Sequence, residues 1–181
     1  MGWETRFSLS GKTALITGAS SGIGTAIAEV FADAGADIAG HGRDKSRLTA
    51  LGARVQKAGR RFVAITGDLA DPIETETVAT EALEVFGQID ILVSSAGIAV
   101  TGPAVTYELA DWQRTLAVNL TAPFILSKIM LPGMIMRKQG KIINISSQTG
   151  VIALEDHAAY ATSKGGLNAL TKSLMTEAAP H

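Results

Sequence analysis

The 181-residue sequence contains no cysteine. This absence excludes a disulfide framework, a thiolate nucleophile and a zinc site built on sulfur ligands. Aromatic residues make up only 5% of the chain, and there are five prolines against nineteen glycines. This balance is typical of an α/β protein whose strands turn tightly into helices.

The chain also lacks an excess of charge of either sign. Sixteen Lys and Arg residues face seventeen Asp and Glu residues, which leaves a formal net charge of −1. Because binding to phosphate backbones needs a basic excess or stripe, we expect no nucleic-acid partner. With 46% hydrophobic and 18% charged residues, the composition excludes a disordered chain and indicates one globular domain over residues 1–181.

A long uninterrupted apolar run is absent as well. Residues 1–10 contain Glu4 and Arg6 and lack the apolar core of a signal peptide. The most apolar stretch, residues 116–136, is interrupted by Asn119, a lysine and two prolines. We therefore expect no membrane partner and a cytoplasmic location.

Short apolar runs alternate with helical patterns along the chain. Strands are predicted at residues 12–17, 37–40, 61–66, 89–93 and 141–145, and helices at residues 23–34, 45–58, 71–86, 108–136 and about 157–178. The strand runs are continuously apolar, which predicts burial on both faces. Strands alternating with helices predict right-handed crossovers and a parallel sheet. The expected fold class is α/β, a single doubly wound (Rossmann-type) sheet with helices on both faces.

A glycine-rich segment, Thr17–Gly24 (TGASSGIG), follows the first predicted strand and opens the first helix. A loop that passes close to a pyrophosphate has no room for β-carbons, which explains glycine at positions 18, 22 and 24. The start of the following helix would direct free N–H groups and a positive dipole end at the phosphates. This position favours a dinucleotide site over a glycine-rich turn without a ligand.

A second group of candidate residues lies far downstream. Tyr160 and Lys164 are four residues apart on the last predicted helix and therefore share one face. Ser147 follows the fifth strand, at the sheet edge where ligands of open α/β proteins bind. By itself the pair could be a surface tyrosine beside a solvated lysine, but its place at the same edge as the glycine loop favours a site.

With these motifs the sequence resembles the short-chain dehydrogenase/reductase family from Leu9 to His181. The resemblance is carried by TGASSGIG, Gly67–Leu69, Ser95–Gly97, Asn119–Leu120, KIINISS and YATSK. It implies a catalytic tetrad of Asn119, Ser147, Tyr160 and Lys164, and no metal. The cofactor-binding residues that it implies are Gly18, Ser20, Ser21, Gly22, Ile23, Gly24, Arg43, Asp68, Leu69, Ser95, Ala96, Gly97, Tyr160 and Lys164, with the Asp68 carboxylate on the adenine.

The tetrad implies interconversion of a secondary alcohol and a ketone. An ammonium at Lys164 and an oxidised nicotinamide ring would both favour the phenolate form of Tyr160, so that it could act as a base. Ser147 would hydrogen-bond the substrate oxygen, and Lys164 would also bind the ribose hydroxyls. Asn119 would hold a water that links Lys164 to solvent; taken alone, it would be interpreted as a helix-kink or cap residue. The hydride chemistry belongs to the cofactor.

Cofactor preference depends on the end of the second strand. NAD-selective members of the family place an acid there, which accepts from the ribose 2′-hydroxyl. Here that position is Gly42, and Arg43, which follows, suits a 2′-phosphate. This favours NADP over NAD, whereas the adjacent Asp44 and a serine at position 21, where many NADP users carry a basic residue, leave NAD open.

Gln148 and His157 resemble residues of the polyol dehydrogenase and xylulose reductase branch. Together with Ser147 and Tyr160 they are expected to contact a linear, hydroxyl-rich small molecule, although a solvent-facing His157 fits the sequence equally well. The expected reaction is a polyol–ketose interconversion. Reduction of a 3-ketoacyl or other small ketone is an alternative, as is a non-catalytic nucleotide sensor or scaffold on the same fold, against which the full tetrad argues.

The sequence departs from the family in two places. Ser94–Gly97 (SSAG) stands where Asn-Asn-Ala-Gly is usual, so the amide that ties neighbouring strands is replaced and a local change is expected. Relatives also continue beyond residues 178–181 into further strands and a substrate lid, so we expect C-terminal strands to be missing and the fifth strand to have an unpaired edge. Apolar residues on several faces of helices 108–136 and 160–178 predict a homo-oligomer, a dimer or tetramer.

Overall fold

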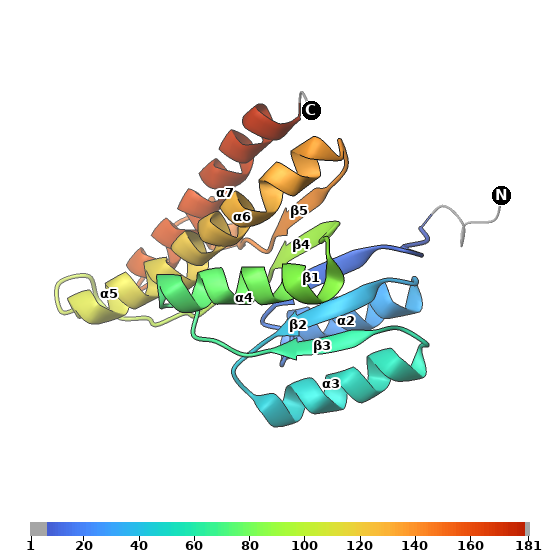
Figure 1. Cartoon of the computed structure of the whole chain (residues 1–181). Helices are drawn as coiled ribbons and strands as arrows, with labels where there is room; N and C mark the ends of the chain where they lie inside the picture. Colours follow the sequence, from blue (N-terminus) through green and yellow to red (C-terminus); the bar gives the residue numbers. More distant parts are fainter. Residues whose placement is uncertain (1–6, 180–181) are drawn as a thin grey trace.

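The computed structural model describes residues 7–179. The remaining residues, which include part of the segment examined for a signal peptide and the last two residues of the chain, lie outside this range. The elements, in chain order, are β1 (Thr13–Thr17), α2 (Gly22–Asp33), β2 (Asp37–His41), α3 (Lys45–Lys57), β3 (Phe62–Ile65), α4 (Pro72–Phe86), β4 (Ile91–Ser94), α5 (Leu109–Leu116), the π-helical turn η1 (Ala117–Thr121), α6 (Ala122–Met136), β5 (Lys141–Asn144), the short turn η2 (Gln148–Gly150) and α7 (Ala158–Ala178) (Figure 1).

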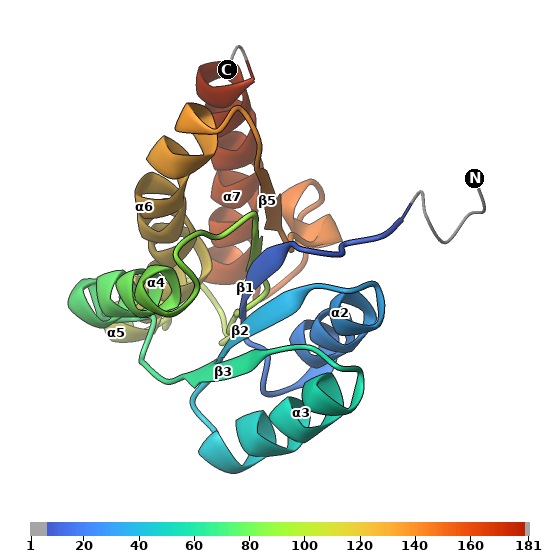
Figure 2. The same cartoon turned by 45° about the vertical axis from the view of Figure 1, so that its right-hand side comes forward.

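The strands form one parallel sheet in the order β3-β2-β1-β4-β5. Leu15 in the central strand lies opposite Ala39 on one side and Leu92 on the other. Helices α2 and α3 cover one face of the sheet, and α4 and α6 cover the other (Figure 2). The predicted α/β class and the doubly wound sheet are thus confirmed. Because the strand order reverses between β1 and β4, a crevice opens there at the carboxyl ends of the strands.

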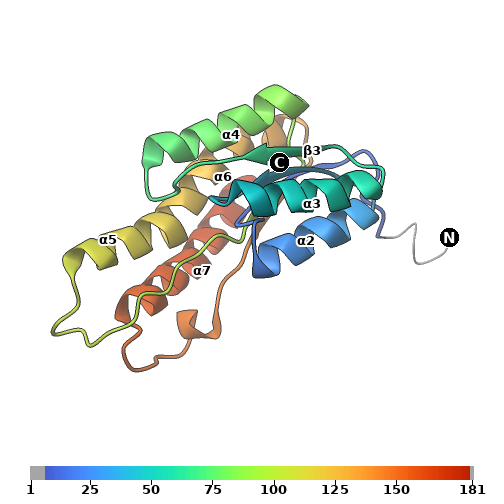
Figure 3. The same cartoon turned by 90° about the horizontal axis from the view of Figure 1, so that it is seen from below.

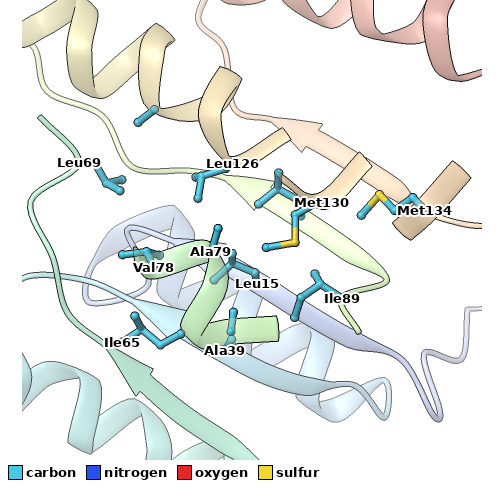
Figure 4. Packing of buried hydrophobic residues seen from close by; sticks show 13 residues of the cluster. Leu15, Ala39, Ile65, Leu69, Val78, Ala79, Ile89, Leu126, Met130 and Met134 are labelled. Atoms are coloured by element: carbon cyan, nitrogen blue, oxygen red, sulfur yellow. The ribbon is translucent and has the colours of Figure 1, made fainter. Parts of the chain in front are cut away.

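Two apolar cores hold the layers together. On one face Leu15 and Ile89 pack with Val78, Leu126 and Met130 of α4 and α6 (Figure 4). On the other face the neighbours of Leu15 in β1 point toward α2 and α3, because successive residues of a strand face opposite sides. Residues of β1 and β4 are buried along their whole length, as the continuous apolar runs predict.

Burial on both faces is a wrong prediction for the two edge strands. In β5, Ile143 remains 40% exposed and Lys141 is also exposed. In β3, Ala64 is exposed. Each of these strands pairs on one side only among the described residues. A continuous apolar run therefore does not tell a central strand from an edge strand.

Two of the helices that flank the sheet, α3 and α4, begin with a side-chain cap. Asp44 accepts the N–H of Arg47 at the start of α3. Asp71 accepts the N–H groups of Ile73 and Glu74 at the start of α4, and Pro72 stands at the first helical position. Helix α2 has neither a side-chain cap at Ser21 nor an acidic residue in its first turn. Its first N–H groups are left for another partner.

The helical run Leu109–Met136 is long and apolar enough to cross a membrane by length and composition alone. Half of its most apolar 18-residue window is buried within the domain. Leu126, Met130 and Met134 of this run belong to the core between the sheet and α4. Packing against the sheet therefore accounts for part of its apolar character.

Candidate active site

A cleft of about 420 Å³ opens where β1 and β4 end, and we call it the switch-point cleft. Every predicted cofactor residue except Tyr160 and Lys164 lines it. Six further residues line it that were not predicted to bind the cofactor: His41, Gly42, Gly67, Ile98, Arg114 and Val118.

The floor of the switch-point cleft is packed backbone against backbone. Gly18 has φ +69°, and a β-carbon there would lie 2.9 Å from the backbone of Ala96. A β-carbon on Gly24 would lie 2.3 Å from the carbonyl oxygen of Gly18. Thr17 Oγ1 accepts the N–H groups of Ser95 and Ala96, both at 3.1 Å, and so ties the ends of β1 and β4 together. Only glycine allows the two loops to approach this closely.

The uncapped start of α2 faces the same loop. Free N–H groups and the positive end of a twelve-residue helix attract an anion. The lining of the cleft, Gly18 to Gly24, supplies the approach that a phosphate needs without β-carbons in the way. These residues fit the pyrophosphate of a dinucleotide.

Charged side chains line one end of the switch-point cleft. Arg43 follows Gly42, where a β-carbon would lie 2.6 Å from Ser20 Oγ. The Asp68 carboxylate accepts the N–H of Ala70 at 3.0 Å and a guanidinium N–H of Arg114 at 3.0 Å. The bond from Ala70 and the cations of Arg114 and Arg43 hold the pKa of Asp68 below its usual range. The carboxylate is therefore ionised at neutral pH.

Asn119 lies in η1, the π-helical turn that divides the helix predicted over residues 108–136 into α5 and α6. Its side chain is fully buried. Oδ1 accepts the N–H of Ile98 at 2.9 Å, and Nδ2 donates to the Ile98 carbonyl at 2.8 Å and to Ser163 Oγ at 3.0 Å. Ser163 in turn donates to the carbonyl of Tyr160 at 2.7 Å. Asn119 thus joins the loop after β4 to α7.

Lys164 lies between the switch-point cleft and Tyr160. Nζ donates to the Ile145 carbonyl at 2.7 Å and lies 5.8 Å from the centre of the Tyr160 ring. A β-carbon on Gly97, which lines the cleft, would lie 3.6 Å from the same Nζ. The side chain is buried, and this burial lowers the pKa of Lys164. One amine therefore reaches both the cleft wall and the tyrosine.

Ser147 stands just before η2 and is held by Thr149. Its Oγ accepts the N–H of Thr149 at 3.2 Å and the hydroxyl of Thr149 at 2.9 Å. A hydroxyl that accepts two bonds keeps its own proton for a further acceptor. A serine followed two residues later by a threonine is a local turn signal in the sequence. Only the structure shows that Thr149 donates to Ser147 and so leaves the serine proton free.

The predicted substrate residues lie outside the switch-point cleft. Gln148 is exposed. His157 Nδ1 lies 2.6 Å from the Glu155 carbonyl, and its ring meets the Tyr160 ring edge-on with centroids 6.4 Å apart. The loop before α7 lies beside the loop after β4, where the Gly102 N–H donates to the Asp156 carbonyl at 2.9 Å (Figure 3).

Among residues 7–179, two of the buried polar atoms without a hydrogen-bond partner lie at the ends of β4 and β2. Ser94, at the position where the usual amide is replaced, has a buried Oγ without a partner. His41 Nε2 pairs with the Gly67 carbonyl at 3.1 Å, whereas its Nδ1 has no partner. Burial is the largest cause that lowers the pKa of His41.

The chain is similar in sequence and structure to known dehydrogenases and oxidoreductases. A family model described as short chain dehydrogenase matches residues 12–181. The D-threitol dehydrogenase of Mycolicibacterium smegmatis is 40% identical over 94% of this chain and 66% of its own length. The NAD-dependent glycerol dehydrogenase of Listeria innocua is 35% identical over 99% of this chain and 70% of its own length. The chain thus spans about two thirds of these curated relatives. A crystal structure of a metagenomic short-chain oxidoreductase in complex with NADP superposes with a TM-score of 0.90 at 40% identity, covering 93% of this chain and 77% of that one.

Proposed function

Since the chain belongs to the short-chain dehydrogenase family, we propose that its protein interconverts a secondary alcohol and a ketone with a nicotinamide dinucleotide. The observation that carries this proposal is the position of Lys164. Its buried Nζ lies beside Gly97 at the cleft wall and 5.8 Å from the Tyr160 ring. An ammonium there can bind the ribose hydroxyls of a dinucleotide in the cleft and also stabilise the Tyr160 phenolate.

Each tetrad residue then has a defined task. In the bound state the dinucleotide supplies or accepts the hydride. In reduction the Tyr160 hydroxyl gives its proton to the ketone oxygen, and in oxidation the Tyr160 phenolate takes the proton of the alcohol. The Lys164 cation stabilises the phenolate that reduction leaves. Ser147 donates its free proton to the same substrate oxygen.

In this scheme Asn119 positions neighbouring segments of the chain. Its amide groups bind Ile98 and Ser163, and so hold the loop after β4 against α7 at the height of the tetrad. A fixed distance between Lys164 and the cleft wall follows. That Asn119 also holds a water that links Lys164 to solvent stays a prediction.

NADP is the cofactor that we propose in preference to NAD. Arg43 lines the switch-point cleft directly after Gly42, the position of the acid in NAD-selective members. A guanidinium there suits a 2′-phosphate. The solved relative that holds NADP supports this choice, and the NAD-dependent glycerol dehydrogenase supports the alternative, NAD.

A polyol–ketose couple is the substrate class that we propose. Gln148 and His157 follow Ser147 in the loops beyond the sheet edge and offer polar groups to a hydroxyl-rich chain. The D-threitol and glycerol dehydrogenases act on polyols by name, which supports the same choice. We also propose that the protein is cytoplasmic and forms a homo-oligomer, a dimer or tetramer.

One observation favours the second candidate, a reductase of 3-ketoacyl or other small ketones. Val151, Ile152 and Leu154 are 82%, 51% and 44% exposed in the segment after η2. Apolar side chains at this place suit an acyl chain better than a polyol. The two candidates therefore differ in the polarity of the substrate beyond the reacting carbon.

Absorbance at 340 nm tests the proposal, with both cofactors against polyols, ketoses and β-ketoesters. Tyr160→Phe should keep cofactor affinity and lose about 10²- to 10⁴-fold in kcat, the usual contribution of a general acid–base group. The matched control is Tyr107→Phe, which removes the other phenolic hydroxyl, a donor to the Val100 carbonyl, and should keep kcat. Unchanged turnover in Tyr160→Phe would reject the mechanism. Cofactor binding without any turnover would favour the sensor or scaffold.

A further inference from the structure

An ion pair lies in the lining of the switch-point cleft. Arg114 Nη2 in α5 lies 3.0 Å from Asp68 Oδ2 in the loop between β3 and α4, and both residues line the cleft. The pair joins elements that are 46 residues apart in the chain. It therefore links two separate segments of the chain that both line the cleft.

The loop that carries Asp68 does not depend on Arg114 for its backbone position. The Asp68 N–H donates to Glu74 Oε2 at 2.7 Å, and its carbonyl accepts the N–H of Asp71 at 2.9 Å. Both partners lie on the Asp68 side of the cleft, at the start of α4. The guanidinium thus acts on the carboxylate alone.

The two oxygens of this carboxylate are held from different directions. Oδ1 accepts the N–H of Ala70, and Oδ2 accepts from Arg114. With both oxygens bound, rotation of the carboxylate plane is restricted. Each oxygen keeps a second lone pair, and an ionised carboxylate only accepts hydrogen bonds. The free lone pairs call for a donor such as an amino group.

We propose that Arg114 is a positioning residue, which holds the Asp68 carboxylate in the orientation that accepts the exocyclic amino group of the adenine. This role rests on the proposed function, because it needs a dinucleotide in the switch-point cleft. A base with an oxygen in place of that amino group would present lone pairs to lone pairs and bind less well. Arg114 therefore contributes to the choice of base without touching it.

The ion pair contributes little to folding. Its side chains are 42% and 39% exposed, and exposed pairs add little stability because water screens them. Replacing Arg114 by glutamine should leave a folded protein. The change can then be followed by ligand binding.

The test measures dissociation constants of Arg114→Gln for NADPH, for its hypoxanthine analogue and for reduced nicotinamide mononucleotide, which has no adenine. The wild-type protein should prefer adenine over hypoxanthine by about tenfold or more, the range of a hydrogen bond to a charged group. Arg114→Gln should lose most of this preference and bind the mononucleotide as the wild type does. The matched control is Arg54→Gln, which removes an arginine paired with Glu29 outside the switch-point cleft and should keep the preference.

A double-mutant cycle separates positioning from a direct contact. Because Arg114 acts through Asp68, the variant with both Arg114→Gln and Asp68→Asn should lose no more base preference than Asp68→Asn alone. Equal weakening of all three ligands in Arg114→Gln would overturn the proposal, since it would indicate a structural role. A loss for NADPH that is absent for NADH would also overturn it and indicate contact with the 2′-phosphate. If the wild type binds the dinucleotides and Arg114→Gln keeps the preference, only this inference fails. If the wild type binds no dinucleotide, the proposed function fails with it.

Discussion

Replacing Gly24 by alanine tests the close approach on which the switch-point cleft is built. The added β-carbon would lie 2.3 Å from the carbonyl oxygen and 2.7 Å from the carbonyl carbon of Gly18, where ordinary contact starts at 3.4 Å. Both atoms are backbone, so the loop between β1 and α2 has to move by about 1 Å, a displacement that typically costs about 100-fold in function. We expect NADPH affinity or kcat/KM to fall by about that factor.

Stability should change much less in the same variant. Overpacking costs about 1–3 kcal/mol, and the better helix propensity of alanine offsets about 1 kcal/mol of it. The free energy of unfolding, measured in urea by circular dichroism, should therefore fall by at most about 2 kcal/mol.

The matched control is Gly59→Ala, which lies after α3 and outside the cleft. Gly59 has φ +76° and nothing within 4 Å of a β-carbon, so alanine costs only backbone strain, about 1–2 kcal/mol. This variant should lose a similar amount of stability and keep its NADPH affinity. Equal NADPH affinities in the two variants, measured by cofactor fluorescence, would refute the reasoning from the close approach.

Two further predictions concern single side chains. Thr149→Val keeps the shape of the side chain but removes the hydroxyl that donates to Ser147, so kcat should fall by about fivefold to tenfold at unchanged NADPH affinity. Thr149→Ser should restore kcat. An unchanged kcat in Thr149→Val would contradict the role of the serine proton. Burial lowers the pKa of His41 from its ordinary value of 6.5, so the unfolded chain takes up a proton before the folded one as the pH falls. The free energy of unfolding should therefore decrease below about pH 6.5, by at most about 1.4 kcal/mol per pH unit for this group, and urea titrations should show a flatter profile for His41→Asn. A variant as steep as the wild type would assign the pH dependence to other groups.

Much of the fold is predictable because its signals are local. The helix starts predicted at residues 23, 45 and 71 depend on a few neighbouring residues, and α2, α3 and α4 begin within one residue of them. Glycine spacing and the strand–helix alternation likewise predicted the loop that lines the switch-point cleft. Such features follow from backbone sterics and hydrogen bonding over one or two turns.

The exposure of the edge strands and the links between distant elements were not predictable in this way, although the family resemblance predicted the unpaired edge of β5. The apolar run of β5 has the same composition as a central strand, and only the strand order leaves Ile143 partly exposed. Arg114 carries no motif, and its pairing with Asp68 depends on how α5 lies relative to the loop between β3 and α4. The bonds of Ser163 to Asn119 and Tyr160 depend in the same way on how α7 lies against η1.

By itself the sequence determined the order and type of the elements and predicted candidate site residues at the carboxyl edge of the sheet. The tertiary structure decided which of these residues touch, that β3 lies at an edge, and that one lysine lies near both the cleft wall and the tyrosine ring. The physical reason is range: helix caps and periodicity act over a few residues, whereas a hydrogen bond between distant segments exists only where packed layers set their distance and rotation.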